Sequence, residues 1–461
     1  MCYTKIENVL DCYENVIVGG FEFMFLHYLT SEKTGDRINL VDYSTSESDS
    51  IISVDRRERY QEIIGFGGAF TESAAFTLSM MSKADRQRVI DLYFNQESGL
   101  KYNIGRVHIN SSDFSLGNYT YVENNDVLLK TFDIRREKKL VIPLIKDAEK
   151  ASGKKIDLLA SPWSPPEWMK SNNEMNNGGK LLPRYYESWA KYYVKFIDEF
   201  RKQGLNIEYI TVQNEPAAKQ TWDSCLYTAE EERDFVRDYL GPILHAKYPD
   251  VKIIIWDHNR DIIVERGDTV LKDKEARDHV WGTGVHWYVS EEFENLSKLH
   301  NLHPDKHLLF TEGCIEGGVH LGAWHTGERY ARNMIGDFQN YCEGYIDWNI
   351  TLNEIGGPNH VGNYCDAPII SDTVNQELHL NSSYYYIGHF SKFVPKGSRR
   401  ISSKSNSEDL KNVAFETPDG EIVLIILNET ANEHKTSIKI DNINRDLLIP
   451  SHTISTITYR E

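Results

Sequence analysis

Short apolar runs alternate along the chain with longer amphipathic stretches, beginning near residue 61. Each run has the length of a buried strand, and a helix-sized, charged segment separates it from the next. Such alternation predicts parallel strands joined by helices. Eight runs are expected to be strands: Glu62–Gly68, Tyr102–Ile109, Ile156–Ala160, Ile207–Val212, Val251–Asp257, Gly282–Tyr288, His307–Thr311 and Gly344–Ile350. Because eight parallel units close a (β/α)8 barrel, we expect an α/β fold of the TIM-barrel type.

Two of the intervening segments carry specific helix signals. In Tyr185–Lys202 the apolar residues recur at the spacing of one helical face. The second segment, Thr228–His245, begins with Thr228 and has Glu231 three residues later. This is the spacing of a capping box, in which each side chain accepts a hydrogen bond from the other residue's backbone N–H. We therefore expect helices over both segments.

The pattern changes near Lys396. Residues 397–409 are polar and rich in turn formers, and alternating runs without helical segments follow them. These runs predict an appended antiparallel β-sandwich: Asn412–Phe415, Glu421–Leu427, Thr436–Ile440 and Ser451–Tyr459. Residues 15–55 contain similar short pieces that we expect to complete its sheet. The expected domains are residues 1–58, which contribute strands to the sandwich, residues 59–390, which form the barrel, and residues 391–461, which form the sandwich.

Composition and charge narrow the class of protein. With 461 residues, 40% of them apolar, the chain is long enough for a barrel plus an appended domain. The net charge of −18 argues against a nucleic-acid partner. Charged residues interrupt the apolar positions of residues 1–20, so we recognise no export signal and expect a cytoplasmic protein. The apolar run Gly19–Tyr28 is too short to span a bilayer, and no membrane anchor is expected.

The six cysteines are scattered and form no CxxC pair. This pattern favours reduced thiols. Cys2 and Cys12 are the only two that lie close in sequence, and their redox state stays open.

Two carboxylates stand where barrel strands are expected to end. Glu215 follows the fourth strand and Glu312 follows the seventh. Side chains at the carboxyl ends of barrel strands converge on one mouth, where active sites of this fold lie. Cleavage of a glycosidic bond needs two carboxyl groups, one to protonate the leaving oxygen and one to attack or to activate water. The alternative is that each Glu faces solvent or forms a salt bridge.

Other residues at the same strand ends have both a structural and a functional interpretation. Trp163 and Trp348 are either core residues or flat surfaces on which a sugar ring stacks. Arg106 lies on the second strand and forms either a buried ion pair or the cation that keeps a neighbouring carboxylate ionised. Asp113, just beyond that strand, reads as a loop acid when taken alone.

Competing chemistries find little support. The chain has no HExxH, no P-loop and no GxSxG motif, and the glycines of residues 65–68 lack the GxGxxG spacing. The histidines His258, His286, His320 and His325 lie too far apart in sequence to suggest a metal cluster, and we interpret each as a hydrogen-bonding or core residue. Cys314 reads as a packed thiol. We therefore expect neither a metal nor a cofactor.

The motifs together resemble glycoside hydrolase family 30, in its glucosylceramidase (acid β-glucosidase) branch. The resemblance covers nearly the whole chain after about residue 15, in the same order and spacing. The matching stretches are GFGGAFTESAA (65–75), YNIGRVHINSSDFS (102–115), LLASPWSPPEWMK (158–170), TVQNEP (211–216), GVHWY (284–288), LLFTEGC (308–314), DWNITLNEIGGPN (347–359), YYIGHFSKFVPKGSRRI (385–401) and VAFETPDGEIVLIILN (413–428).

This resemblance implies a (β/α)8 barrel fused to a β-sandwich built from both chain ends, and a retaining double displacement. By motif, Glu215 would be the acid/base and Glu312 the nucleophile. Further family positions would bind the sugar or surround the nucleophile: Asn214 at the 2-hydroxyl, Asp113 and Trp163 at the far hydroxyls, Trp348 and Asn363 along the cleft, and Arg106, His286 and Tyr288 around the nucleophile. We expect Glu312 to raise the pKa of Glu215 by like-charge repulsion.

The segments that depart from the family pattern lie where the leaving group would bind. They are residues 171–180, 217–225 and 315–324. The leading expectation is a β-glucosidase acting on a small β-glycoside or a glycolipid, in a bacterial cytoplasm. Open alternatives are a β-xylosidase, an enzyme accepting β-glucosides, β-xylosides and β-fucosides alike, a β-1,6-glucanase, and a catalytically silent carbohydrate-binding protein. The sequence predicts neither the natural aglycone nor the oligomeric state.

Overall fold

The computed structural model describes residues 15–18 and 21–460, and their chain forms two compact units. One unit, here called the barrel unit, comprises residues 65–326 and 336–384. The other, the sheet unit, comprises the described residues up to Ile64, residues 327–335 and the chain from Tyr385 onward. Cys2 and Cys12 lie outside the described residues.

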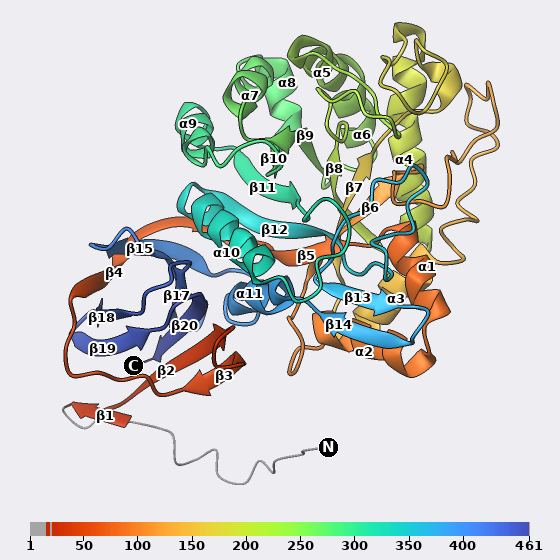
Figure 1. Ribbon diagram of the computed structural model, residues 1–461. Coiled ribbons are helices and arrows are strands. Elements are labelled where there is room, and N and C mark those ends of the chain that lie inside the picture. Colours follow the sequence, from red (N-terminus) through yellow and green to blue (C-terminus); the bar gives the residue numbers. More distant parts are fainter. Residues whose placement is uncertain (1–14, 19–20, 461) are drawn as a thin grey trace. The chain divides into compact units, whose positions relative to one another are not determined.

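The barrel unit contains a closed ring of parallel strands (Figure 1). In chain order its strands are β5 (Gly65–Ala69), β6 (Ile104–Ile109), β7 (Asp157–Pro162), β8 (Asn206–Thr211), β9 (Lys252–Asn259), β10 (Val280–His286), β11 (His307–Glu312) and β12 (Cys342–Asn349). The eight expected strands are therefore confirmed. The first one begins later than expected, because Glu62 still belongs to the preceding strand, β4, of the sheet unit.

Helices follow the barrel strands along the chain. They are α1 (Glu72–Met80), α2 (Lys83–Phe94), α3 (Val141–Ser152), α4 (Tyr186–Lys202), α5 (Ala229–Phe235), α6 (Gly241–His245), α7 (Ile263–Leu271), α8 (Lys274–His279), α9 (Glu294–Leu302), α10 (Trp324–Gln339) and α11 (Ser382–Ser391). Shorter elements are the 3-10 turns Glu167–Met169 and Pro183–Tyr185 and the hairpin of β13 (Ile369–Asp372) and β14 (Glu377–Leu380).

Both helix predictions are confirmed, the second with an interruption. Helix α4 buries the aromatic face that its spacing predicts, including Trp189, Tyr193 and Phe196. At α5 the Thr228 side chain accepts from the backbone N–H of Glu231, and the Glu231 carboxylate accepts in return from the N–H of Thr228. A π-helical turn, Val236–Leu240, separates α5 from α6 within the segment predicted as one helix.

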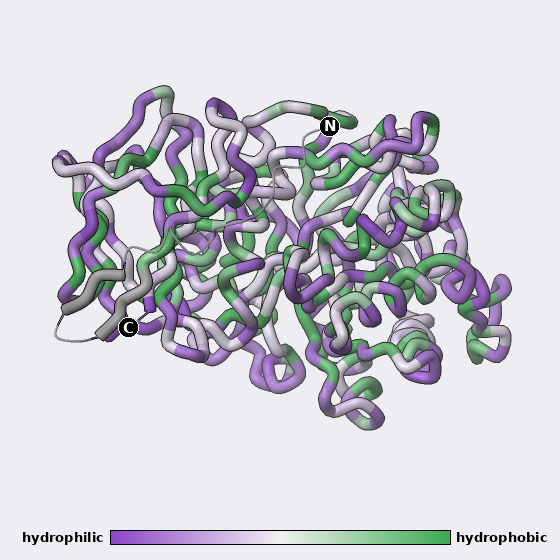
Figure 2. Tube along the Cα trace, turned by 90° about the horizontal axis from the view of Figure 1, so that it is seen from below, coloured by the Kyte–Doolittle hydropathy of each residue, from purple (hydrophilic) through white to green (hydrophobic). Residues whose placement is uncertain are grey.

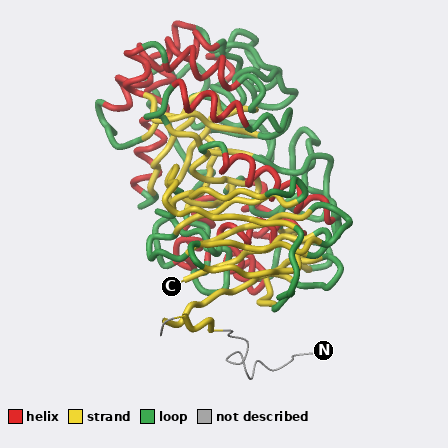
Figure 3. Tube along the Cα trace, turned by 90° about the vertical axis from the view of Figure 1, so that its left-hand side faces the viewer, coloured by secondary structure: helices red, strands yellow, loops and turns green. Residues whose placement is uncertain are grey.

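The sheet unit is built on ten strands, drawn in yellow in Figure 3. They are β1 (Asn15–Val18), β2 (Phe21–Ser31), β3 (Arg37–Val41), β4 (Ser50–Glu62), β15 (Arg399–Ser405), β16 (Leu410–Glu416), β17 (Ile422–Asn428), β18 (His434–Ile440), β19 (Ile443–Ile449) and β20 (Thr453–Arg460). Strands from both chain ends pair, since β2 lies beside β20 and β4 beside β15. One pairing, β18 with β4, is parallel.

The interpretation of residues 397–409 as turns is wrong in part, because Arg399–Ser405 forms strand β15 between β4 and β16. Its polar residues reflect a strand whose middle residues are buried while its ends remain accessible. The core of the sheet unit is aliphatic, with Leu424, Ile438 and Ile457 fully buried. Figure 2 shows hydrophobic and hydrophilic stretches alternating along the chain. No helix in the described part of the chain is long and apolar enough to cross a membrane.

A β-bulge in β9 shapes the mouth of the barrel. Relative to β10, the register advances by one extra residue between Ile255 and His258. Trp256 and Asp257, within the bulge, both have left-handed backbone angles, with φ of 69° and 48°. Neighbouring side chains on a regular strand point to opposite faces, and a bulge changes that alternation. As a result both Asp257 and His258 reach the same group of side chains at the end of the barrel.

Candidate active site

The carboxyl ends of the barrel strands surround a cavity of about 450 Å³. This is the size of a pocket for a small organic ligand. Most of the side chains singled out in the sequence line it: Asp113, Trp163, Asn214, Glu215, Tyr288, Glu312, Trp348 and Asn363. The two that do not, Arg106 and His286, are fully buried and contact its carboxylates from behind. The structure therefore brings every expected site residue into one place.

Glu312 is the last residue of β11, and both of its carboxylate oxygens accept hydrogen bonds. Arg106 Nη1 donates to Oε2 at 2.7 Å, and the Tyr288 hydroxyl donates to Oε1 at 2.9 Å. Burial raises the pKa of Glu312, and the positive charges of His286 and Arg106 offset only part of that rise. The hydrogen bonds nevertheless favour the carboxylate form, since both donors stay protonated at neutral pH and each occupies one oxygen.

Arg106 joins the acidic groups of the site. Its Nη2 donates to Asp257 Oδ2 at 2.8 Å and to Asn214 Oδ1 at 3.0 Å. The guanidinium carbon lies 4.8 Å from the centre of the Trp163 ring. Arg106 is thus a buried ion pair and at the same time the cation beside Glu312, so both interpretations of this residue apply. Removing it would take a buried ion-pair partner from both Asp257 and Glu312, which is costly.

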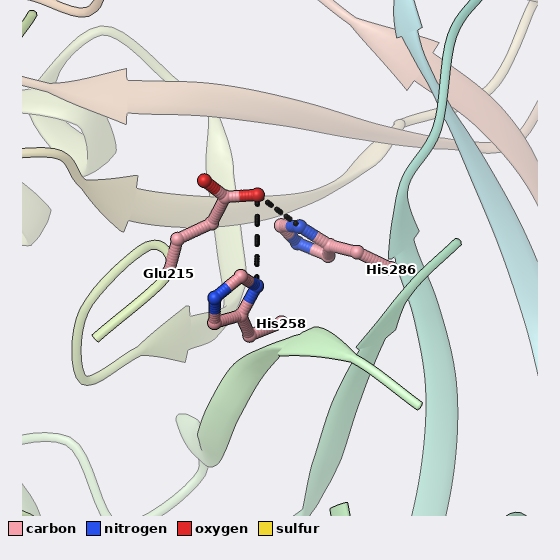
Figure 4. A group of neighbouring side chains, drawn as sticks. All are labelled: Glu215, His258 and His286. Carbon is pink, nitrogen blue, oxygen red and sulfur yellow. Dashed lines mark hydrogen bonds and ion pairs between the residues drawn. The ribbon is translucent and has the colours of Figure 1, made fainter. Parts of the chain in front are cut away.

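Glu215 lies between two histidines (Figure 4). Its Oε1 is 3.2 Å from His286 Nδ1 and 3.6 Å from His258 Nδ1, while its Oε2 accepts from Gln220 Nε2 at 3.3 Å. The other ring nitrogen of His286 lies 3.0 Å from Asp257 Oδ1. Glu215 has a left-handed backbone, with φ of 47°, and its N–H donates to the Asp257 carbonyl at 3.1 Å. A strained backbone held by its surroundings is common at active sites.

The electrostatics of Glu215 differ from the expectation. Burial raises the pKa of Glu215, but the charge of His258 and the hydrogen bond and charge of His286 outweigh burial and lower it. Burial lowers the pKa of His286, but the charge of Glu312 and the hydrogen bonds to Asp257 and Glu215 raise it to about 9. The expected rise in the pKa of Glu215 is therefore wrong in the free protein. The expectation did not include the two histidines that lie beside this carboxylate. The two shifts favour an ionised Glu215 facing a protonated His286 across 3.2 Å.

The opposite wall of the cavity is aromatic and amide-rich. Trp163 and Trp348 stack with ring centres 5.1 Å apart, and both belong to a buried cluster while lining the cavity. Asp113 accepts from Asn363 Nδ2 at 3.0 Å and from Asn359 Nδ2 at 3.3 Å, both at Oδ2. Burial raises the pKa of Asp113 to about 7. Asp113 is thus a buried acid that lines the cavity, rather than an ordinary loop acid.

Sequence reasoning missed several contributors. Asp257 ends an expected strand but was not singled out, and its carboxylate contacts Arg106, His286 and Thr311. A polar residue at the end of a predicted barrel strand is the signal that could have found it. Gln220 and Trp222, in the departing segment after Glu215, also line the cavity.

The histidine interpretation needs a correction. Distance in sequence separates His258 from His286, yet adjacent strands β9 and β10 bring both onto Glu215, and the three could together bind a metal ion. His320 and His325 lie near each other on a different segment. Cys314 is a buried thiol as expected, and it contacts the Tyr288 hydroxyl at 3.5 Å.

Comparison with known proteins agrees with this geometry. Residues 63–394 match the model of the glycosyl hydrolase family 30 TIM-barrel domain, and residues 397–457 match that of the family 30 β-sandwich domain. Lysosomal acid glucosylceramidase of Mus musculus is 36% identical over 89% of this chain and 83% of its own length. An endo-1,6-β-D-glucanase of Aspergillus fumigatus is 28% identical over 81% of this chain and 80% of its own length.

Solved structures give the same result. SrfJ from Salmonella typhimurium superposes with a TM-score of 0.90 at 37% identity, covering 95% of this chain and 100% of that one. A solved endo-β1,6-glucanase superposes with a TM-score of 0.86 at 28% identity, covering 95% of this chain and 99% of that one. With a barrel, a sandwich and paired carboxylates in the expected places, the chain belongs to glycosyl hydrolase family 30 and is a glycoside hydrolase.

Proposed function

We propose that the protein is a retaining, exo-acting β-glucosidase in which Glu312 is the nucleophile and Glu215 the acid/base. The observation that carries the proposal is the difference between the two carboxylates. Glu312 accepts hydrogen bonds from Arg106 and Tyr288, whereas Glu215 faces His286, whose raised pKa keeps a proton at hand. One carboxylate is therefore ready to attack and the other has a proton available, which is the division of roles that retention requires.

In the first step a Glu312 oxygen attacks the anomeric carbon of the sugar. The bond from that carbon to the leaving oxygen breaks, and the leaving oxygen takes the proton from Glu215. His286, whose own proton faces Glu215 Oε1, keeps the pair protonated before the step. Retention also requires the two carboxyl groups to approach within about 5–5.5 Å, and this spacing remains a prediction for the substrate complex.

In the second step water hydrolyses the glycosyl–enzyme ester. Glu215 takes the proton from the water as its oxygen attacks the anomeric carbon, and Glu312 leaves as a carboxylate. Formation of the ester removes the negative charge of Glu312, so the carboxylate form of Glu215 becomes easier to maintain and acts as the base. Arg106 and Tyr288 stabilise the carboxylate that returns at the end of the cycle.

The aromatic wall supports glucose as the sugar. The paired indoles of Trp163 and Trp348 offer an apolar surface for the sugar ring. Asp113, placed by Asn363, has a free oxygen for the hydroxyls far from the anomeric carbon. Asn214, bonded to Arg106 through its carbonyl oxygen, retains its amide hydrogens for the 2-hydroxyl. The relatives named for glucosylceramide support a glycolipid as one substrate, and a role in sphingolipid metabolism would follow from it.

The β-1,6-glucanase alternative is favoured by relatives that carry this activity in their names, at 28% identity. The two functions differ in what occupies the cavity beyond the scissile bond, where Gln220, Trp222 and Glu316 of the departing segments lie. An exo-glucosidase releases glucose from the chain end, while an endo-glucanase needs a second sugar subsite.

A rate panel with purified protein separates these functions. We expect faster hydrolysis of an aryl β-glucoside than of the β-xyloside, β-fucoside or β-galactoside, with glucosylceramide tested next. Equal or faster hydrolysis of the xyloside would contradict the roles of Asp113 and Trp163. Cleavage of a β-1,6-glucan, without action on aryl glucosides, would establish the endo-glucanase. No hydrolysis of any substrate would indicate a carbohydrate-binding protein.

The acid/base assignment has its own test. Glu215→Gln removes the transferable proton while keeping the shape, so we expect loss of activity on poor leaving groups. Azide, which needs no base, should restore turnover of substrates with good leaving groups and yield the β-glycosyl azide. Failure of azide to rescue a folded variant would contradict the assignment.

A further inference from the structure

Three side chains at the acid/base converge on a common point. Figure 4 shows Glu215, His258 and His286 with their polar atoms directed toward one another. One donor atom from each residue lies within 4.8 Å of the other two. His258 Nδ1 is buried and has no hydrogen-bond partner among the described residues. An unsatisfied buried nitrogen is costly, and such a group calls for a physical explanation.

The spacing of these atoms suits a transition metal. Bonds of about 2.0–2.1 Å at tetrahedral angles place neighbouring ligand atoms roughly 3.3 Å apart. The observed separations from Glu215 Oε1 are 3.2 Å to His286 and 3.6 Å to His258. Two imidazoles and one carboxylate form a donor set that Zn²⁺ and Cu²⁺ bind well, whereas Ca²⁺ and Mg²⁺ prefer oxygen ligands only.

The residues behind the ligands also fit. Asp257 Oδ1 lies 3.0 Å from His286 Nε2, so a proton on that nitrogen leaves Nδ1 free to bind a metal. A carboxylate in this position behind a ligating histidine orients the ring and increases its basicity. Glu215 and His258 line the cavity, so a fourth coordination position would face open space suited to water.

We propose that Glu215, His258 and His286 form a binding site for a zinc-like divalent ion, and that its occupancy reversibly inhibits the enzyme. The inhibition rests on the proposed role of Glu215 as acid/base. The ion takes the place of a proton between Glu215 Oε1 and His286 Nδ1, since metal binding releases protons from its ligands. A coordinated Glu215 can neither protonate the leaving oxygen nor accept a proton from water. A bound ion therefore slows turnover, and the reaction itself requires no metal.

The test measures metal binding and turnover separately. Calorimetric titration of the metal-free full chain with Zn²⁺ should show one site, and His258→Phe should weaken it by at least about tenfold. Glu215→Gln should weaken it as well, which is measurable although that variant turns over poorly. His325→Phe, at an exposed histidine away from the three ligands, is the matched control and should leave the affinity unchanged. Co²⁺ bound at the site should give the visible absorption bands of a tetrahedral complex, lost in His258→Phe.

Inhibition is read against each variant's own uninhibited rate. We expect Zn²⁺ to inhibit hydrolysis of an aryl β-glucoside competitively, EDTA to restore it, Mg²⁺ to have no effect, and His258→Phe to require at least about tenfold more Zn²⁺. Equal zinc affinity in wild type and His258→Phe, or no binding at all, would overturn the site and leave the proposed function untouched. Binding that depends on His258 but does not slow turnover would support the metal site and overturn the role of Glu215.

Discussion

At the scale of residues, the site is a network of buried charges in which neighbouring acids share their basic partners. Arg106 is shared by Glu312 and Asp257, and His286 is shared by Asp257 and Glu215. Burying such groups is costly unless every one is paired. The pairing sets the protonation of each carboxyl group, and the chemistry depends on that protonation.

Tyr288 tests the environment of Glu312. Tyr288→Phe removes one of the two hydrogen-bond donors to this carboxylate. We therefore predict a roughly 10- to 100-fold loss of kcat, no larger than the loss of one donor causes in other active sites. Tyr102→Phe is the control, since the buried Tyr102 hydroxyl has no hydrogen-bond partner among the described residues. Steady-state kinetics on both variants make the comparison. Equal losses in the two would mean that the Tyr288 hydroxyl has no specific role.

Asp113 predicts a pH dependence of sugar binding. Burial raises its pKa to about 7, so the group is protonated below that pH and ionised above it. An ionised acceptor binds sugar hydroxyls more strongly, by about 1 kcal/mol or roughly fivefold. The affinity for an uncharged inhibitor of glucose configuration should therefore rise between pH 6 and pH 8. Asp113→Asn should bind more weakly and lose this rise, and a rise that persists in the variant would assign it to another group.

The residue scale is also where prediction from sequence stopped. Glu215 and Glu312 were found because polar residues at barrel strand ends are conspicuous. The bulge in β9 was not predictable, since the run VKIIIWDHN has no pattern that indicates an extra residue relative to the neighbouring strand. It brings Asp257 to His286 and His258 to Glu215, and the two histidines reverse the expected direction of the Glu215 pKa shift.

At the scale of elements, apolar periodicity located the barrel strands and the strand ends that carry the site. It failed where a strand has a polar sequence, as in β15, because pairing with two neighbours stabilises that strand without an apolar run. It located the barrel's first strand, although residues Gly65–Ala69 are rich in glycine. There the small side chains, rather than apolar ones, permit close packing.

Gly67 tests this close packing. A Cβ at this position would lie 1.7 Å from the backbone oxygen of Ile104 on the neighbouring strand β6. We predict that Gly67→Ala destabilises the protein by about 3 kcal/mol or more, because backbone cannot move aside as a side chain can. Gly204→Ala separates this effect from backbone strain: Gly204 has φ of 78° with open space around it, so about 1 kcal/mol is expected. Urea unfolding of both variants gives the two values, and similar losses would contradict the packing argument.

At the scale of the whole molecule, the chain combines a closed eight-stranded barrel with a sheet whose strands come from both chain ends. That architecture, and membership of glycosyl hydrolase family 30, could be predicted from motif order and spacing. The leaving group could not, because the segments that would contact it do not clearly match the lipid-handling relatives and their contribution to the cavity depends on loop conformation. The central claim for the molecule is that its hydrolysis proceeds through a glycosyl ester on Glu312.

Trapping that ester is the most direct measurement. A 2-deoxy-2-fluoro-β-glucosyl fluoride reacts with a retaining β-glucosidase but slows breakdown of the intermediate, so the enzyme should gain the mass of one fluorosugar. Peptide mapping should place the label on Glu312, and Glu312→Gln should remain unlabelled. A label on another residue would contradict the assignment of the nucleophile. A product of inverted configuration, formed without any label, would contradict the double displacement itself.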